Sequence, residues 1–282
     1  MPVLRRSLLL GFAGACIAPV GFAHTLASAD VAEIVEKNAA ARGGLEAWKR
    51  LQTMAWTGYV ESGGRTGHNL QFMLEQKRPG KTRFELVTDG RRSIRIYDGK
   101  GGWKLRPNPA NGRPELSPYT EDEIRFARSA PVIDGPLMDY VAKGAIVTLA
   151  GQGEAEGRRA YILKVQLPLR GEERIWVDAE TFLEVRHDRQ VRAGVGQAGT
   201  VTVLFREYRE FEGLKIPTEI ETGAGMGGAA NKLVIERVAL NPDLDDRAFA
   251  RPEVPTSRKN SVIVDTRGTA TGRGAQPAAN RP

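Results

Sequence analysis

The sequence predicts a mainly β (α+β) fold, in which one strongly curved antiparallel sheet carries helices on its hollow side. From residue 56 onward, apolar and polar residues alternate with a period of two over successive short runs. Such alternation is typical of strands with one buried face. Turns that contain Gly or Pro separate these runs. Helical patterns are confined to residues 30–51, an insert at about 118–143 and a final turn, so helices are expected to cover the sheet.

Residues 1–29 fit the three-part pattern of a removable secretory signal. Arg5 and Arg6 supply the positive start, the run Ser7–Val20 is largely apolar, and an Ala-Ser-Ala cleavage site ends at Ala29. The apolar run is shorter than the about 20 residues that a membrane-spanning helix needs. We therefore expect an exported protein that works in the periplasm after the signal is cleaved.

Cys16 is the only cysteine of the chain and bears on its localisation. A lipoprotein cysteine usually follows a leucine three residues earlier, whereas Ala13 occupies that position here. This favours a soluble periplasmic protein, with a lipoprotein anchored through Cys16 as the alternative. Once the signal is removed, the mature chain has neither an internal disulfide nor a thiolate nucleophile.

The charge distribution argues against a nucleic-acid-binding protein. The chain has a net charge of +7, but its signal holds two arginines, and residues 252–282 hold five basic and two acidic residues. The remaining part, 30–251, therefore has a net charge of only +2, and it is expected to form a single domain. A nucleic-acid site would instead cluster basic residues on one face. The tail is poor in large apolar residues and is expected to be disordered. It is either a solvated end or a contact to anionic lipid head groups.

The expected mature chain opens with a helix. Asp30 and Glu33 form a start that resembles a capping box, and Gly43-Gly44 ends the helix. A short second turn of helix is expected over Leu45–Leu51. The alternation then predicts five strands, which contain Trp56 to Val60, Leu70 to Leu74, Phe84 and Leu86, Ile94 and Ile96, and Trp103 and Leu105.

The insert that follows is predicted to be helical. Thr120 and Glu123 form a capping box, so the acidic run Glu121-Asp122-Glu123 is interpreted as a helix start rather than as a metal or acid–base cluster. A second helix is expected after Asp134-Gly135-Pro136, with Leu137 and Tyr140 on its apolar stripe. Strands are then expected at Ala145–Ala150, Ala160–Leu167, Glu173–Val177, Leu183–Arg189, Val201–Phe211, Pro217–Glu221 and Lys232–Leu240, before a helical turn at Asp243–Phe249.

No motif predicts a cofactor, a metal or a catalytic residue. Two GxGxxG runs, Gly194–Gly199 and Gly223–Gly228, lead into β-type sequence, whereas a dinucleotide site needs a helix there. They are interpreted as hairpin loops. His68 and His187 lack zinc-site spacing. His187-Asp188 imitates part of a catalytic triad, but no GxSxG motif accompanies it, and an exposed pair at a strand end is expected instead.

Five segments together resemble the periplasmic lipoprotein carrier family typified by LolA, within the outer-membrane lipoprotein-sorting superfamily. The segment Lys77–Phe84 contains a KRP turn, and Asp98–Trp103 contains a DGK turn followed by Trp. The segments Ala41–Leu45, Asp134–Leu137 and Phe249–Pro252 are also similar to parts of this superfamily. The order of these motifs along about residues 30–255 carries the resemblance, since each turn by itself is common in β proteins.

The resemblance implies an incomplete β-barrel whose concave face is covered by helices and holds acyl chains. The arginine of the KRP turn, matched by Arg78, would contact the lid and help to hold it shut. A buried CH₂ group contributes about 0.8 kcal/mol, so an acyl chain is a strong ligand for an apolar cavity. The residues expected to line this cavity are Trp56, Phe72, Leu74, Phe84, Ile94, Ile96, Trp103, Leu137 and Tyr140. Packing of these side chains in a dry core is the alternative.

The expected function is therefore a non-catalytic periplasmic binding or carrier protein. It would hold a lipid or the acyl chains of a lipoprotein, without a cofactor and as a monomer. The alternative is a sensor or scaffold module that binds lipoprotein and a regulatory protein. A hydrolase is a third hypothesis, for which no group of residues in the sequence provides support.

Overall fold

The computed structural model describes residues 30–62, 69–130, 133–168, 171–192, 198–224 and 231–254. The predicted signal with Cys16, His68, the tail beyond residue 254 and the tips of both Gly-rich loops lie outside the described residues. Within the described part, none of the helices has both the length and the apolarity that a membrane crossing requires.

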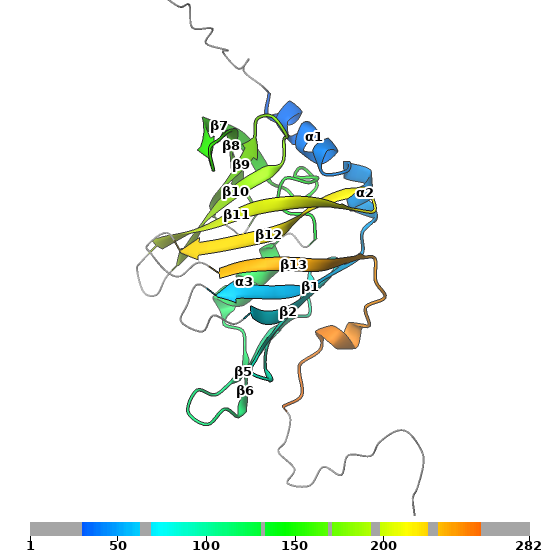
Figure 1. Cartoon of the computed structure of the whole chain (residues 1–282), viewed down its shortest axis with the longest axis vertical. Helices are drawn as coiled ribbons and strands as arrows, with labels where there is room; N and C mark the ends of the chain where they lie inside the picture. Colours follow the sequence, from blue (N-terminus) through cyan, green and yellow to red (C-terminus); the bar gives the residue numbers. More distant parts are fainter. Residues whose placement is uncertain are drawn as a thin grey trace, which may run out of the picture.

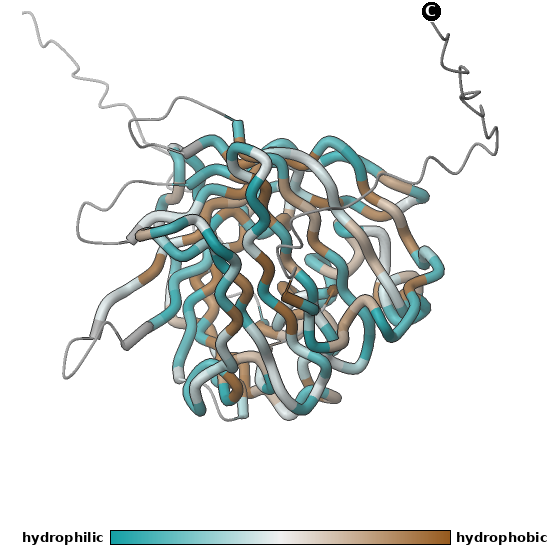
Figure 2. Tube along the Cα trace, turned by 90° about the horizontal axis from the view of Figure 1, so that it is seen from below, coloured by the Kyte–Doolittle hydropathy of each residue, from teal (hydrophilic) through white to brown (hydrophobic). Residues whose placement is uncertain are grey.

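Thirteen antiparallel strands form one continuous sheet within the described residues (Figure 1), which confirms the mainly β fold class. In chain order they are β1 (Thr53–Ser62), β2 (Asn69–Lys77), β3 (Lys81–Thr88), β4 (Arg91–Tyr97), β5 (Gly102–Pro107), β6 (Pro114–Pro118), β7 (Ile146–Ala155), β8 (Arg158–Gln166), β9 (Glu172–Asp178), β10 (Glu184–Arg192), β11 (Ala198–Phe211), β12 (Leu214–Ala224) and β13 (Asn231–Leu240). Figure 2 shows how polar and apolar residues alternate along these strands.

The sheet consists of two meanders joined by its first and last strands. β1 to β6 extend in one direction, β13 to β7 extend in the other, and β1 pairs with β13, so that β6 and β7 form the two edges. The β1–β13 ladder changes register at Gly58, where an added Cβ would lie 2.0 Å from the carbonyl oxygen of Val234. Only glycine allows this close approach of the two backbones.

The helices α1 (Val31–Ala41), α2 (Leu45–Arg50) and α3 (Glu121–Ser129) lie over the same face of the sheet, which we call the inner face. The Asp30 carboxylate caps α1 by accepting a hydrogen bond from the backbone N–H of Ala32, as the sequence predicts. The capping box of Thr120 and Glu123 at the start of α3 is confirmed, with both hydrogen bonds present.

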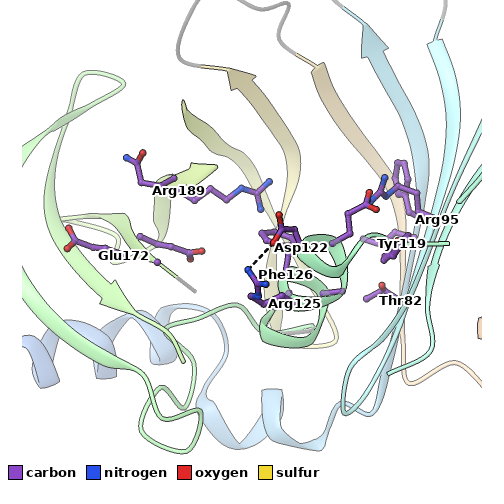
Figure 3. Close-up of a pocket in the computed structure, with 16 residues that line it drawn as sticks. Thr82, Arg95, Tyr119, Asp122, Arg125, Phe126, Glu172 and Arg189 are labelled. Atoms are coloured by element: carbon purple, nitrogen blue, oxygen red, sulfur yellow. Dashed lines mark hydrogen bonds and ion pairs between the residues drawn. The ribbon is translucent and has the colours of Figure 1, made fainter. Parts of the chain in front are cut away.

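Two groups of buried side chains hold α1 and α2 against the inner face. Ile34 of α1 packs against Leu163 and Ile175 of β8 and β9. Trp48 of α2 packs against Met54 and Ile216 of β1 and β12. Both helices thus contact strands far along the sequence, β8 and β9 for α1 and β12 for α2. The two helices therefore cover only part of the inner face, and α3 lies over the rest (Figure 3).

The outer face is covered at one place by the C-terminal helical turn η1 (Asp246–Phe249), a turn that the sequence predicts. Phe249 is buried against Ile94, Ile96 and Leu105 of β4 and β5. The Arg83 guanidinium donates a hydrogen bond of 3.0 Å to the carbonyl oxygen of Ala248 and ties η1 to β3.

The predicted second helix of the insert is wrong. Residues 133–144 form a series of turns, which we call the cover loop. Ile133, Gly135, Asp139 and Gly144 all have positive φ, from 51° to 77°, which interrupts a right-handed helix. Strand β6 is not predicted from the sequence, because proline at both of its ends hides the alternation.

Candidate ligand cavity

A cavity of about 810 Å³ lies between α3 and the two arms of the sheet (Figure 3). Strands β2, β3 and β4 form one wall, and β9 and β10 form the other. A second cavity of about 260 Å³ continues toward Trp48 and Trp56 and shares Phe126, Ala130, Glu173 and Arg189 with the first. The volume of the larger cavity suits a ligand, since small-molecule pockets commonly have about 300–1,000 Å³.

The wall formed by β2 and β3 is apolar. Leu74 and Phe84 face each other across the two strands and line the larger cavity. The Phe84 ring stacks on Phe72 with 6.0 Å between the ring centroids. Opposite this wall, α3 presents Phe126, which is 43% exposed. An aromatic side chain so exposed inside a cavity can still gain from burial by a ligand.

No residue of α3 is fully buried, and polar contacts bind its first turn to the sheet. Glu123 pairs with Arg95 of β4 at 3.1 Å and with Lys104 of β5 at 2.7 Å. Partial burial alone would raise the pKa of Glu123, but hydrogen bonds from Lys104, the backbone N–H of Thr120 and Arg95 lower it to about 2. The first turn of α3 is thus bound to the β4–β5 arm through an ionised carboxylate.

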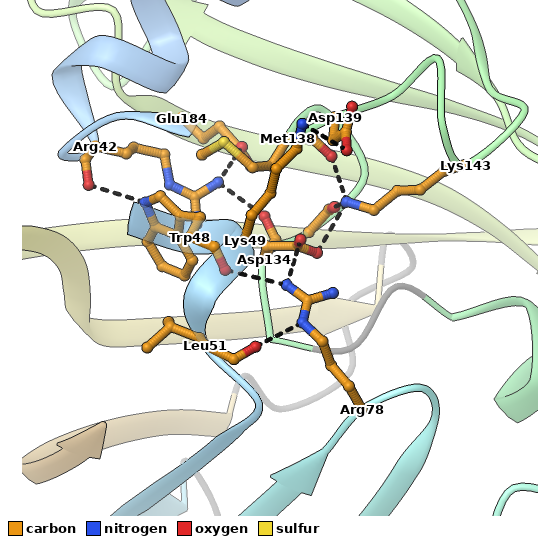
Figure 4. Close-up of polar contacts among 11 residues, drawn as sticks. Arg42, Trp48, Lys49, Leu51, Arg78, Asp134, Met138, Asp139, Lys143 and Glu184 are labelled. Carbon is orange, nitrogen blue, oxygen red and sulfur yellow. Dashed lines mark hydrogen bonds and ion pairs between the residues drawn. The ribbon is translucent and has the colours of Figure 1, made fainter. Parts of the chain in front are cut away.

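The cover loop is held by a buried charge network centred on Asp134 (Figure 4). The Asp134 carboxylate accepts hydrogen bonds of 2.8 Å from Arg78 and from Lys143. Arg42, at the end of α1, donates to the Asp134 carbonyl oxygen and pairs with Glu184 of β10 at 3.2 Å. Burial lowers the pKa of Lys143 despite the nearby Asp134 carboxylate. These charges are poorly solvated, so each depends on its partners.

Arg78 connects three parts of the chain. Besides its contact with Asp134, its Nε atom donates to the carbonyl oxygen of Leu51 at 2.7 Å, and its Nη2 atom donates to that of Trp48 at 3.3 Å. The arginine of the β2–β3 turn therefore joins α2 to the cover loop. The family resemblance implies that Arg78 contacts a lid, and the identity of that lid belongs to the proposal below.

The predicted cavity residues fall into separate groups. Leu74 and Phe84 line the larger cavity, and Trp56 lines the smaller one. Phe72 is buried within the apolar cluster of β1–β3 and β13. Leu137 is fully buried in the cluster beneath α1, and Tyr140 packs against that cluster. Leu137 and Tyr140 therefore belong to the packed core and line neither cavity.

Ile94, Ile96 and Trp103 lie on the outer face, and their assignment to the cavity is corrected. Ile94 and Ile96 are buried together with Phe249 of η1, and Trp103 packs against the same cluster. Their strand neighbours Arg95 and Lys104 point to the inner face instead, where they pair with Glu123. The predicted alternation of apolar and polar residues in β4 and β5 is present, but the apolar residues are buried on the outer face and not on the inner one.

Four further residues line the larger cavity and were not predicted from the sequence: Phe126, Arg95, Tyr119 and Arg189. The capping box locates the helix that carries Phe126, and the aromatic side chain among its mostly charged residues was the available signal. Nothing local distinguishes Arg189 from the other arginines of β10 (Glu184–Arg192).

His187 and Asp188 point to opposite faces of β10. His187 contacts Glu173 at 2.8 Å on the inner face, whereas Asp188 accepts hydrogen bonds from Trp176 and Thr202. The expected exposed pair at a strand end is therefore wrong, since His187 lies within β10 with a side chain only 13% exposed. Among the residues that the structure describes, no cluster of His, Cys, Asp or Glu could hold a metal ion.

The strands that flank both GxGxxG runs pair as antiparallel neighbours, β10 with β11 and β12 with β13. This agrees with hairpin connections and not with a dinucleotide-binding loop, which leads from a strand into a helix.

Comparison with known proteins defines the class of fold. No family model and no curated protein matches the sequence. Among solved structures, the chain is similar to a LolA superfamily protein from Nitrosomonas europaea, with a TM-score of 0.50 at 13% identity over 79% of this chain and 98% of that chain. A putative outer membrane lipoprotein-sorting protein domain from Vibrio parahaemolyticus gives a TM-score of 0.49 at 12% identity over 77% and 94%. The protein has a LolA-like fold: an open, curved antiparallel sheet with helices on its inner face.

Proposed function

We propose that this protein is a non-catalytic periplasmic binding or carrier protein that holds a lipid, or the acyl chains of a lipoprotein, beside α3. The observation that carries this proposal is the 810 Å³ cavity, into which Phe126 is exposed opposite Leu74 and Phe84. Burying an aromatic side chain contributes about 1.5–3 kcal/mol, and an acyl chain adds about 0.8 kcal/mol for each buried CH₂. The LolA-like fold supports the same conclusion.

We further propose that α3 and the cover loop form the lid of this cavity. α3 has no buried residue and is bound mainly through Glu123, so it can move away without exposing core side chains. The cover loop is more firmly attached, because Arg78 and Arg42 from outside the loop both bind Asp134, and Lys143 of the loop itself pairs with the same carboxylate. In this arrangement Arg78 anchors the lid at the β2–β3 turn, and α3 is the part that opens.

The test uses the exported protein purified from the periplasm without detergent. Native mass spectrometry should detect a bound lipid, and a neutral, polarity-sensitive fluorescent acyl probe should bind with about one molecule per protein. Natural lipid should displace that probe. Absence of both co-purified lipid and saturable probe binding contradicts the proposal.

A sensor or scaffold module that also binds a protein is the second candidate. The observation in its favour is two exposed apolar side chains near one edge of the sheet: Val141 of the cover loop is 72% exposed, and Ile146, the first residue of edge strand β7, is 65% exposed. An exposed strand edge can pair with an added strand from another protein. A stable complex with one defined protein and an empty cavity, seen in the same native mass spectrum, would favour this function over the carrier.

A further inference from the structure

Arg189 differs from the other cationic side chains around the cavity. Arg95 pairs with Glu123 at 3.1 Å, and Arg125 pairs with Asp122 at 2.9 Å. The guanidinium of Arg189 lies instead over the ring of Phe126, with 5.4 Å between its central carbon and the ring centroid. Figure 3 shows Arg189 beside Phe126 in the larger cavity, and Arg189 also lines the smaller one.

The Arg189 charge is incompletely compensated. Its Nε atom is buried and has no hydrogen-bond partner in the described part of the chain. Burial lowers the pKa of Arg189, although the Glu173 carboxylate on the neighbouring strand opposes this effect. That carboxylate also contacts His187 at 2.8 Å. Arg189 lines the cavity and its charge is poorly solvated, so an anion that enters the cavity would compensate this charge.

The surroundings of Arg189 specify the shape of such a ligand. The opposite wall, with Leu74 and Phe84, offers apolar surface, and Phe126 continues this surface up to the guanidinium. A guanidinium presents parallel N–H donors that match the two oxygens of a carboxylate or phosphate. A ligand that contacts both the apolar wall and the Arg189 guanidinium has a hydrocarbon chain at one end and an anionic group at the other.

We propose that Arg189 binds the anionic head, a carboxylate or a phosphate, of an acyl-chain ligand whose chain lies along Phe126, Phe84 and Leu74. This inference rests on the proposed lipid-binding function and narrows its ligands to anionic amphiphiles. A charge-assisted hydrogen bond contributes about 1.5–3 kcal/mol, which corresponds to about a ten- to hundredfold change in affinity.

The experiment compares a fluorescent fatty acid, ionised at pH 8, with its methyl ester. The wild-type protein should bind the acid about tenfold or more tightly than the ester. Arg189→Gln should weaken acid binding about ten- to hundredfold and leave ester binding unchanged. The matched control is Arg186→Gln, which removes a cation of the same strand that pairs with Asp188 at 2.8 Å and lines neither cavity, and it should change neither affinity.

Two competitors identify the source of the anionic group. Oleate and a lysophosphatidic acid each carry one acyl chain, and the stronger competitor shows whether the site prefers carboxylate or phosphate; either preference supports the proposal. Inorganic phosphate alone should not displace the fluorescent acid, since it lacks the chain. Displacement by inorganic phosphate would instead show a simple anion site and overturn the proposal.

The outcomes also separate this inference from the proposed function. If both probes bind the wild type equally, or if Arg189→Gln weakens both alike, the anionic-head proposal fails and the lipid-binding function stands. If neither probe binds, the lipid-binding function itself fails. Thermal unfolding should show Arg189→Gln to be at least as stable as the wild type, because the substitution removes a buried charge. Arg189→Met, with a longer apolar stem, provides a second variant should the glutamine variant not fold.

Discussion

Replacing Arg78 by leucine should weaken the attachment of the cover loop while leaving the sheet folded. The substitution removes the hydrogen bonds to Leu51 and Trp48 and the ion pair with Asp134. A hydrogen bond that involves a charged group contributes about 1.5–3 kcal/mol, and the Arg78 side chain is one-quarter exposed. Asp134 keeps its contact with Lys143. We therefore expect the free energy of unfolding to fall by about 1–3 kcal/mol.

The same turn offers a matched control. Lys81 pairs with Asp246, which is largely exposed, so Lys81→Leu should cost only about 0–1 kcal/mol. Arg78→Lys keeps the charge but loses the planar guanidinium with its several N–H donors. Its free energy of unfolding should lie between those of Arg78→Leu and Lys81→Leu. Urea denaturation followed by tryptophan fluorescence measures all three free energies of unfolding.

The lid role of Arg78 predicts a kinetic effect as well. Dissociation of the bound acyl probe, followed by stopped-flow fluorescence, should be faster for Arg78→Leu than for Lys81→Leu. Circular dichroism should show the same strand content in both proteins. If Arg78→Leu has the stability and the dissociation rate of Lys81→Leu, Arg78 does not hold the lid and the argument from its three contacts is refuted.

Other expected outcomes concern the cavity, the outer core, the attachment of α3 and export. Phe126→Ala should weaken binding of the neutral probe about ten- to hundredfold, since it removes about 1.5–3 kcal/mol of apolar contact, and should hardly change the melting temperature. Ile96→Ala, at a fully buried outer-face position, should lower the free energy of unfolding by about 2–5 kcal/mol without changing probe affinity. Because the folded-state pKa of Glu123 is lowered to about 2 from 4.5, its stabilising contribution is fully present above pH 4.5 and is lost as the pH falls through about 2. The difference in unfolding free energy between wild type and Glu123→Gln should therefore be constant above about pH 5 and shrink below it. N-terminal sequencing of the periplasmic protein should begin at Asp30; a lipid-modified Cys16 at the N-terminus would contradict the predicted cleavage.

Local patterns were sufficient for most of the elements. Alternation with a period of two identified twelve of the thirteen strands, and the capping box located α3, because both depend on residues close together in the sequence. The helical turn at Phe249 was also predicted. The cover loop was not, since the apolar spacing of Ile133, Leu137 and Tyr140 is compatible with a helix until the positive φ angles are known.

Most of the candidate site depended on which face of each strand the rest of the chain covers. Alternation shows that Ile94 and Ile96 share a face opposite Arg95, but it does not show which face is the inner one. The C-terminal turn η1 decides this by burying the two isoleucines on the outer face, and Glu123 of α3 stabilises Arg95 on the inner one.

The amino-acid sequence by itself thus determined the β fold class, most of the elements and the presence of Arg78 in a turn. Only the tertiary structure decided that Arg78 meets Asp134 and that Arg189 stands beside Phe126 in the cavity. The physical reason is that strand periodicity and helix capping are local, whereas these contacts join residues 56 and 63 positions apart in the sequence. Such contacts form only when the curved sheet brings the insert over its inner face.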